Sequence, residues 1–359
     1  MPLDWGLGHA TRCIPIIRYL LEKRCEVTIA AQGAAALLLK SNFPKLTILP
    51  VEGYGVRYSR YAGTFALKIL AQVPKILKAI SNEKKWLIKI QAQYQFDLVI
   101  SDNRYGLKTD GLPSVIMTHQ LQIKSGAGSL ADKLLLHIHY RILERFDQCW
   151  VVDHQDENSI GGELSHPRKI PVNARYIGLL SQLTPNASGQ KTKKDHILVL
   201  LSGPEPQRGL LEQKIISQID EESPYSYTII GGNPGGTAPN GLPSGIAYYS
   251  HLNALQLQEF ISNAELVICR SGYSTLMDLA VMGKKALFIP TPGQSEQEYL
   301  AEYLAKRGLF LSRKQSSLNL SIDVAAALKR PGFGNSNIHF QHQEMKQAMD
   351  ELLQKIARF

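Results

Sequence analysis

Cysteine is scarce in this chain, and the few cysteines are not arranged for bonding. The 359 residues include four cysteines, and none is part of a Cys-x-x-Cys pair. Cys13, Cys149 and Cys269 each lie in or beside an apolar stretch, and Cys25 stands four residues after Leu21. A disulfide framework or a structural zinc site needs cysteines at close, regular spacing. The pattern therefore argues against both and is typical of reduced, buried thiols in a cytoplasmic protein.

Long apolar runs are also missing. No run approaches the ~20 residues that cross a bilayer, so we expect no transmembrane helix. The opening residues, MPLDWGLG, contain neither a basic nor an apolar segment, which argues against a secretory signal. Hydrophobic residues make up 44% of the chain and charged residues 20%, as in ordinary globular proteins. A chain of this length has room for about two domains, each with its own core.

Motifs for metal binding and covalent catalysis are absent as well. The sequence has no Asp-x-Asp pair to hold a metal against a diphosphate, no Cys/His ligand spacing and no serine nucleophile elbow. We therefore expect no metal and no bound cofactor. An anionic ligand would have to be held by backbone N–H groups and cationic side chains instead.

Acidic residues are few in the first half of the chain. Residues 1–180 hold 23 Lys and Arg against 15 Asp and Glu, a net charge of +8, whereas residues 181–359 hold 17 against 16. Residues 57–89, here called the basic stretch, carry eight cations and one acid, Glu83, among large apolar side chains. Such a segment can bind an anionic membrane surface or nucleic acid. Because no nucleic-acid motif accompanies it, we favour the membrane, with a solvated helix face as the alternative.

The clearest motif is VICRSGYSTLMDLAVMGKKALFIPTP at residues 267–292. An apolar run at 266–269 predicts a buried strand, a turn follows, residues 275–282 predict a helix, and a second apolar strand comes next. A strand that turns directly into a helix aims backbone N–H groups and the helix dipole at one point, where a phosphate can bind. Arg270 can add charge-assisted hydrogen bonds, and Asp278 can accept hydrogen bonds from ribose hydroxyls. An ordinary capped turn in a βαβ unit is the alternative.

A second motif, GLGHATR, occupies residues 6–12. Its two glycines permit a tight turn, and residues 11–23 predict the helix that follows. A dinucleotide fingerprint needs a third glycine where this chain has Thr11, which argues against an NAD site. A helix N-terminus lowers the pKa of a histidine, so His9 can accept a proton as neutral imidazole. A histidine that only caps the loop is the alternative.

Only four residues precede Trp5, although such a glycine loop normally follows a strand of ~5–6 residues. In a doubly wound half-domain that strand is central. We therefore expect the first strand of the first domain to be truncated in this sequence and the natural reading frame to extend upstream of Met1.

Strand and helix patterns alternate along both halves, which predicts parallel sheets covered on both faces. In the first half, Asp102 follows a strand at residues 97–101, and His119 follows a strand at 113–118. Ligands of open α/β sheets bind at such strand ends. A polar segment at 181–194 predicts the linker between the halves.

Three further segments complete the expected organisation. Residues 66–93 predict a helix interrupted at Pro74. Residues 231–245 predict a hairpin-like excursion. Residues 338–357 predict a C-terminal helix.

These motifs carry a resemblance. The segment CRSGYSTLMDLAVMGKKALFIPTPG, followed by QEYLAEYL, resembles the donor-binding motif of GT-B glycosyltransferases such as the MurG-type N-acetylglucosaminyltransferases and plant galactolipid synthases. GLGHATR is similar to their first glycine loop. The resemblance implies an α/β protein with two Rossmann-like, doubly wound parallel-sheet domains facing a cleft. It implies an acceptor-side domain at residues 1–180, a donor domain at 195–337 and a helix at 338–359 that returns to the first domain.

The resemblance also implies roles for individual residues. The turn at Arg270 would face the diphosphate of a UDP-sugar, Asp278 would bind the ribose, and Gln297 and Glu298 would contact the sugar. Glu298 departs from the usual Gln of the family and leaves the donor sugar open. A proline-containing loop replaces the second phosphate loop, and Arg208 can reach a phosphate from it. The predicted donor-binding residues are Gly8, Arg208, Arg270, Ser271, Gly272, Ser274, Thr275, Asp278, Gln297 and Glu298.

The implied function is inverting transfer of a hexose or N-acetylhexosamine from a UDP-sugar to an acceptor hydroxyl. His9, or a carboxylate such as Asp102, would remove the proton of that hydroxyl. The acceptor stays open, with a lipid-linked or cell-envelope molecule as one candidate, and nucleic acid is not expected. A non-catalytic nucleotide-sugar-binding protein, a partner-dependent subunit and a nucleotide-sugar epimerase are the alternatives. We expect a cytoplasmic location, with the inner face of the cell membrane as the surface for the basic stretch.

Overall fold

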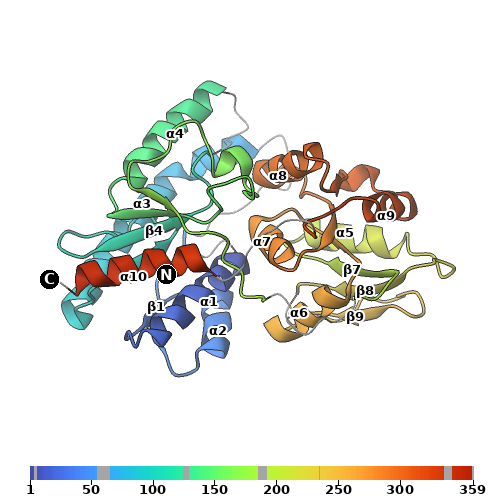
Figure 1. Ribbon diagram of the computed structural model, residues 1–359, viewed down its shortest axis with the longest axis horizontal. Helices are drawn as coiled ribbons and strands as arrows, with labels where there is room; N and C mark the ends of the chain where they lie inside the picture. The colour runs from blue at the N-terminus through green and yellow to red at the C-terminus, as the bar shows by residue number, and fades with distance from the viewer. Residues whose placement is uncertain are drawn as a thin grey trace. The chain divides into compact units, whose positions relative to one another are not determined.

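The computed structural model describes residues 1–3, 6–54, 65–123, 129–184, 192–233, 235–334 and 342–357. The chain divides into two compact units (Figure 1). The first unit comprises Met1–Ser59, Thr64–Gln182 and Gln341–Phe359, and the second holds Leu183–Phe340. Each unit is built on parallel strands with helices between them, which confirms the expected α/β class. Among the described helices, none is both long and apolar enough to cross a membrane.

The first unit contains two parallel sheets, one with the strand order β3-β4-β5-β6 and one formed by β1 and β2. β4 is buried along its whole length, as expected for a parallel strand covered on both faces. The backbone of Met1 lies beside β3, since its N–H group donates to Ile100 O at 2.9 Å and its carbonyl accepts from Asp102 N at 3.0 Å. The elements of this unit are α1 (Leu7–Glu22), β1 (Thr28–Ala30), α2 (Gly33–Asn42), β2 (Thr47–Leu49), α3 (Phe65–Tyr94), β3 (Val99–Asp102), β4 (Ser114–Thr118), α4 (Ser129–Leu143), β5 (Gln148–Val151), η2 (Gly162–Leu164), β6 (Ala174–Tyr176) and α10 (Gln343–Ile356).

The C-terminal helix α10 packs on the first unit, as the resemblance implies. Tyr19 on α1 donates to Asp350 Oδ2 at 2.8 Å, and Lys23 Nζ lies 2.8 Å from Asp350 Oδ1. Arg175 on β6 forms a two-pronged ion pair with Glu351, with Nη2 and Oε1 3.0 Å apart. The apolar face of α10 is buried through Met345, Ala348, Met349 and Leu352.

The second unit has one sheet of six parallel strands in the order β12-β11-β10-β7-β8-β9. The chain starts at β7, builds β8 and β9 on one side and then returns to place β10 on the other. The carboxyl ends of β7 and β10 therefore form the topological switch point, where open α/β sheets bind ligands. The elements are β7 (His196–Leu200), α5 (Gln207–Ile216), β8 (Ser226–Ile230), β9 (Ala247–Tyr249), α6 (Ala254–Asn263), β10 (Leu266–Cys269), α7 (Tyr273–Val281), β11 (Lys285–Phe288), α8 (Ser295–Lys306), β12 (Leu311–Ser312), η3 (Gln315–Ser317) and α9 (Leu320–Leu328).

One core cluster holds this second unit together. Alternate residues of β7, β8, β10 and β11 point to the face covered by α5 and α9, and all of them are buried. On each strand, every second residue points to this face. These residues form one core cluster with Leu211 and Ile215 on α5 and with Leu320 and Val324 on α9, which are spaced four residues apart so that each pair lies on one side of its helix. This packing fixes the end of β10, which Arg270 directly follows.

Three local expectations were wrong. Helix α1 starts at Leu7 rather than at residue 11, so the second half of the glycine loop is the first helical turn. Helix α3 is continuous through Pro74. The free-energy cost of the one backbone hydrogen bond lost at the proline is small beside the stabilisation from the helical hydrogen bonds on both sides of it. Residues 231–245 do not form a hairpin in their described part, since β8 and β9 are parallel and need a crossover connection.

Candidate functional site

In the second unit, the predicted phosphate turn lies at the switch point of the sheet, directly after β10. Arg270 is buried, with only 1% of its surface exposed. Its Nη1 donates to Ile289 O at 2.9 Å and to Pro290 O at 3.2 Å, and its Nη2 donates to Gln207 O at 2.7 Å and to Gln315 Oε1 at 2.8 Å. The guanidinium thus ties the end of β10 to the end of β11 and to the start of α5.

The charge of Arg270 has no carboxylate partner among the described residues. All four of its acceptors are neutral oxygens, and its Nε–H finds no hydrogen-bond partner in the described part of the chain. Burial lowers the pKa of Arg270 to about 10, with a smaller opposing effect from Cys269, so the side chain is still a cation at neutral pH. A buried cation without a counterion favours an anionic ligand nearby.

Helix α7 begins at the same point and adds to this preference for an anion. Gly272 is its N-cap residue, and no side chain caps the helix there. Among the described atoms, a Cβ at Gly272 would meet only Gln297 Nε2, at 3.9 Å, so the N-cap position itself is not crowded. An uncapped helix N-terminus with its dipole is a general anion-binding arrangement. Ser271 does not compete for the ligand, because its Oγ donates to Gln297 O at 2.7 Å.

The pair at the start of α8 is held by the loop after β11. Gln297 is buried, and its Oε1 accepts from Thr291 N at 2.8 Å. Glu298 is exposed, and its Oε1 accepts from Gly293 N at 2.9 Å. These bonds fix both side chains to the β11–α8 loop. Three other predicted donor residues, Ser274, Thr275 and Asp278, lie half-buried on α7.

Arg208 differs from Arg270 because its charge is already neutralised. Its Nε donates to Glu205 Oε1 at 2.7 Å, and its Nη1 contacts Glu212 Oε2 at 3.2 Å and Gly231 O at 3.0 Å. A phosphate would have to displace both carboxylates. The geometry therefore suits a role in fixing the start of α5 better than a direct contact with the donor.

In the first unit, His9 and Asp102 lie side by side. Gly8 and His9 are the second and third residues of α1, and Asp102 is the last residue of β3. His9 Nδ1 is 3.0 Å from Asp102 Oδ2, and the Asp102 side chain is fully buried while that of His9 is 16% exposed. The pairing arises because α1 starts, and β3 ends, at the same edge of this unit.

The two candidates for a general base, Asp102 and His9, differ in how readily each can take up a proton. Burial opposes ionisation of Asp102, but the charge of Arg12 and the hydrogen bonds from His9 and Arg12 outweigh it and hold the pKa of Asp102 well below its usual range. Asp102 is therefore a carboxylate with no tendency to take a proton near neutral pH. Burial lowers the pKa of His9 against the attraction of Asp102, with Arg12 also lowering it, so His9 is a neutral imidazole near pH 7. Of the two, His9 has the properties of a base.

Arg12 was not predicted as a site residue. It is buried, its Nε donates to Asp102 Oδ2 at 2.8 Å, and its Nη1 lies 3.0 Å from His119 Nδ1. The available signal was its position three residues after His9 on one helix, which puts both side chains on the same face. Arg12 thus links His119, which directly follows β4, to the His9–Asp102 pair at the end of β3.

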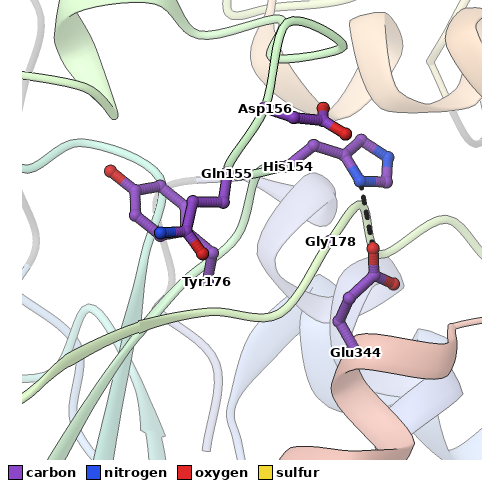
Figure 2. Close-up of a pocket in the computed structure, with 6 residues that line it drawn as sticks. All are labelled: His154, Gln155, Asp156, Tyr176, Gly178 and Glu344. Atoms are coloured by element: carbon purple, nitrogen blue, oxygen red, sulfur yellow. Dashed lines mark ion pairs between the residues drawn. The ribbon is translucent and has the colours of Figure 1, made fainter.

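The first unit also contains a cavity of about 350 Å³. It lies at the carboxyl ends of β5 and β6 beside the first turn of α10. His154 Nδ1 lies 3.3 Å from Glu344 Oε1, and Figure 2 shows these two side chains facing each other. None of the predicted catalytic or donor-binding residues lines it. Its lining residues are His154, Gln155, Asp156, Tyr176, Gly178 and Glu344.

The basic stretch is partly described. Arg57 and Arg60 lie outside the described residues, and side chains are described from position 74 onward. Its one acid, Glu83, is buried and lies 2.9 Å from Arg104 Nε, so it does not offset the cations on the surface of α3. Five lysines on this part of α3 are exposed, namely Lys75, Lys78, Lys84, Lys85 and Lys89. In the part of the chain that can be described, no three His, Cys, Asp or Glu residues gather as a metal site would require.

Comparison with known proteins places this arrangement in a family. Residues 236–356, which contain the β10–α7 turn and the start of α8, match the glycosyltransferase family 28 C-terminal domain. A glycosyltransferase of kitacinnamycin matches 99% of this chain and 97% of its own with a TM-score of 0.70 at 13% identity. The chain is a glycosyltransferase of the GT-B fold with a family 28 C-terminal domain.

Other relatives of this glycosyltransferase are distant. An uncharacterized glycosyltransferase of Methanosarcina acetivorans is 22% identical over 321 residues, which cover 84% of this chain and 82% of the relative. The UDP-N-acetylglucosamine–N-acetylmuramyl-(pentapeptide) pyrophosphoryl-undecaprenol N-acetylglucosamine transferase of Pasteurella multocida is 24% identical over 332 residues, covering 84% and 79%. Spinosyn rhamnosyltransferase has the same fold, with a TM-score of 0.65 at 17% identity over 98% of both chains.

Proposed function

We propose that this glycosyltransferase moves a hexose or N-acetylhexosamine from a UDP-sugar to the hydroxyl of an acceptor, with inversion at the anomeric carbon and with His9 as general base. The observation that carries the proposal is the His9–Asp102 pair, in which Nδ1 of the imidazole lies 3.0 Å from an oxygen of a fully buried carboxylate. The name of the Pasteurella relative, which gives UDP-N-acetylglucosamine as its donor, supports a UDP-sugar. A lipid-linked acceptor is the candidate that the same name suggests.

The donor is expected to bind at the second unit. Its diphosphate would lie in front of α7, where the N-terminal N–H groups and the Nε–H of Arg270 offer positive charge. Asp278 on α7 would accept hydrogen bonds from the ribose. Gln297 and Glu298, fixed to the β11–α8 loop, would contact the sugar. The diphosphate then needs no metal, because the fixed dipole and the cation supply the charge.

The chemistry is a single displacement. With Nδ1–H of His9 donating to Asp102, Nε2 of His9 takes the proton of the acceptor hydroxyl. The acceptor oxygen forms a bond to the anomeric carbon while the bond from that carbon to the diphosphate oxygen breaks. UDP leaves with the electron pair, and the positive end of α7 with Arg270 stabilises its charge. One displacement inverts the configuration at the anomeric carbon.

A donor screen tests the proposal. UDP-N-acetylglucosamine, UDP-galactose and UDP-glucose are each incubated with a membrane lipid extract, and released UDP and labelled lipid are measured. We expect one donor to give both products in the wild type and neither in His9→Ala. UDP binding without any turnover would favour a binding protein or a subunit, and isomerised donor without an acceptor would favour an epimerase.

A further inference from the structure

Arg12 is the buried centre of a network that surrounds the proposed base. Its guanidinium donates to both oxygens of Asp102, through Nε at 2.8 Å and through Nη2, and its Nη1 lies 3.0 Å from His119 Nδ1. The same Nη2 is 2.9 Å from His9 Nδ1. Arg12 therefore contacts Asp102 at the end of β3, His119 just after β4, and His9 itself.

In this geometry, His9 Nδ1 can be either a hydrogen-bond donor or a hydrogen-bond acceptor. His9 Nδ1 can donate to Asp102 Oδ2, which leaves Nε2 as the proton acceptor that a base needs. Alternatively, Nδ1 can accept from Arg12 Nη2, and then Nε2 carries the hydrogen and cannot act as a base. His9 can therefore act as a base only if the two hydrogens of Arg12 Nη2 are donated to acceptors other than His9 Nδ1.

Asn103 offers the missing acceptor. In the amide orientation that satisfies both ends, its nitrogen donates to Thr118 Oγ1 at 2.9 Å and to Met117 O at 3.2 Å, and its oxygen is 3.2 Å from Arg12 Nη2. The two hydrogens of Nη2 then go to Asp102 Oδ1 and to the Asn103 oxygen. His9 Nδ1 keeps its own hydrogen for Asp102.

The charge of Arg12 acts in the same direction. An unopposed Asp102 carboxylate would draw a proton onto His9 and form an imidazolium–carboxylate pair. Arg12 neutralises that carboxylate at both oxygens, and its proximity also disfavours a positive charge on the imidazole. His119 Nδ1 accepts a hydrogen bond from Arg12 Nη1, which directs that donor away from His9.

We propose that Arg12 is a positioning residue, which keeps His9 neutral and protonated on Nδ1, and that Asn103 makes this possible by accepting the Arg12 hydrogen that would otherwise compete. The idea rests on His9 being the base of the proposed reaction. The network itself is measurable without any turnover.

The first test is NMR of the histidine side chains in wild type and Arg12→Gln, with the His9 signal assigned from its loss in His9→Gln. In the wild type we expect an Nδ1–H tautomer and a pKa below the ordinary 6.5. In Arg12→Gln we expect the pKa of His9 to rise by about one pH unit or more. Activity should then fall at pH 7 and recover as the pH is raised, because a base with a higher pKa is protonated up to a higher pH. A purely structural role would lower kcat equally at every pH.

The second variant, Asn103→Gly, keeps the charge and isolates the tautomer. Asn103 has a φ of 53°, which glycine adopts without strain, so this variant decides the matter even if Arg12→Gln does not fold. We expect its His9 signal to change to the Nε2–H tautomer and kcat to fall, while UDP binding is unchanged. Arg18→Gln, an exposed substitution on the same helix, is the control. A His9 pKa and tautomer equal to wild type in the folded variants would overturn the proposal. Full transfer activity in His9→Ala would instead refute the proposed base and leave the NMR result to decide on the network.

Discussion

At the scale of single residues, the roles of three buried arginines follow from the charge of their partners. Arg12 and Arg208 face carboxylates of the protein, which neutralise their charges. Within the described part of the chain, Arg270 faces only neutral oxygens. Sequence analysis could place Arg270 at a strand end, but its partners Gln207 and Gln315 lie 63 and 45 positions away. Such long-range partners have no local signal, whereas the carboxylate partners of Arg208, Glu205 and Glu212, lie only three and four positions away.

The first prediction concerns Arg270. Arg270→Lys retains a charge but loses the planar fork that reaches four acceptors. We expect unfolding free energy to fall by about 1–3 kcal/mol because buried carbonyls lose their donors, and affinity for UDP to fall more than affinity for uridine. Calorimetric titrations with both ligands measure the difference, with exposed Arg330→Lys as the control. Equal losses for UDP and uridine would remove Arg270 from the diphosphate.

The second prediction concerns His9. His9→Ala should lower kcat by roughly 10²–10⁴ while donor affinity changes little, since the imidazole acts on the acceptor. In the wild type, kcat should decline as the pH falls through the lowered pKa of His9, below the ordinary 6.5, because the imidazole then becomes protonated. A pH–rate series measures both effects. A rate near that of the wild type in His9→Ala would assign the base to another group.

At the scale of elements, segments with strong local patterns were predicted and weakly patterned ones were missed. The β10 strand was predicted at its observed bounds, Leu266–Cys269, because it is a continuous apolar run before a turn. Helix α2 was missed because GAAALLLKSN has neither an N-cap side chain nor a clear polar face. β6 has only three residues, all half-buried, and is set by its pairing with β5. In both cases tertiary contacts, rather than local sequence, determine the structure.

The third prediction concerns the basic stretch on α3. The exposed cations there accompany Leu77 and Ile88, which are 58% and 49% exposed, while Glu83 is buried. Such a helix face can bind an anionic lipid surface through charge and apolar contact. We expect the protein to sediment with phosphatidylserine vesicles at low salt and to be released as salt screens the charges. A Lys84→Glu/Lys85→Glu double variant should bind less.

Lys45→Glu, an exposed change elsewhere on the first unit, is the control for that experiment. Equal binding to neutral vesicles would contradict an electrostatic contact. Absence of binding at all salt concentrations would assign the lysines to a solvated face.

At the scale of the whole molecule, the last helix, α10, follows the second unit in the sequence but belongs to the first unit in the structure. The family 28 match extends to residue 356, yet α10 packs on α1 and β6 of the first unit. Apart from Gly8 on α1, the predicted donor-binding residues lie in the second unit, and none of them lies on α10. Stability of the first unit and donor binding by the second should therefore respond to different substitutions.

The last prediction separates these two properties. Met349→Ala removes a fully buried side chain of α10, so we expect it to destabilise the first unit by about 2–5 kcal/mol. UDP at a hundredfold excess over its Kd should still stabilise the unit that binds it by ~2.7 kcal/mol, as in the wild type. Calorimetric unfolding with and without UDP measures both, and exposed Gln347→Ala on the same helix should change neither. If Met349→Ala abolished UDP stabilisation in a folded protein, the donor site would depend on α10, and the assignment of that site to the second unit alone would be wrong.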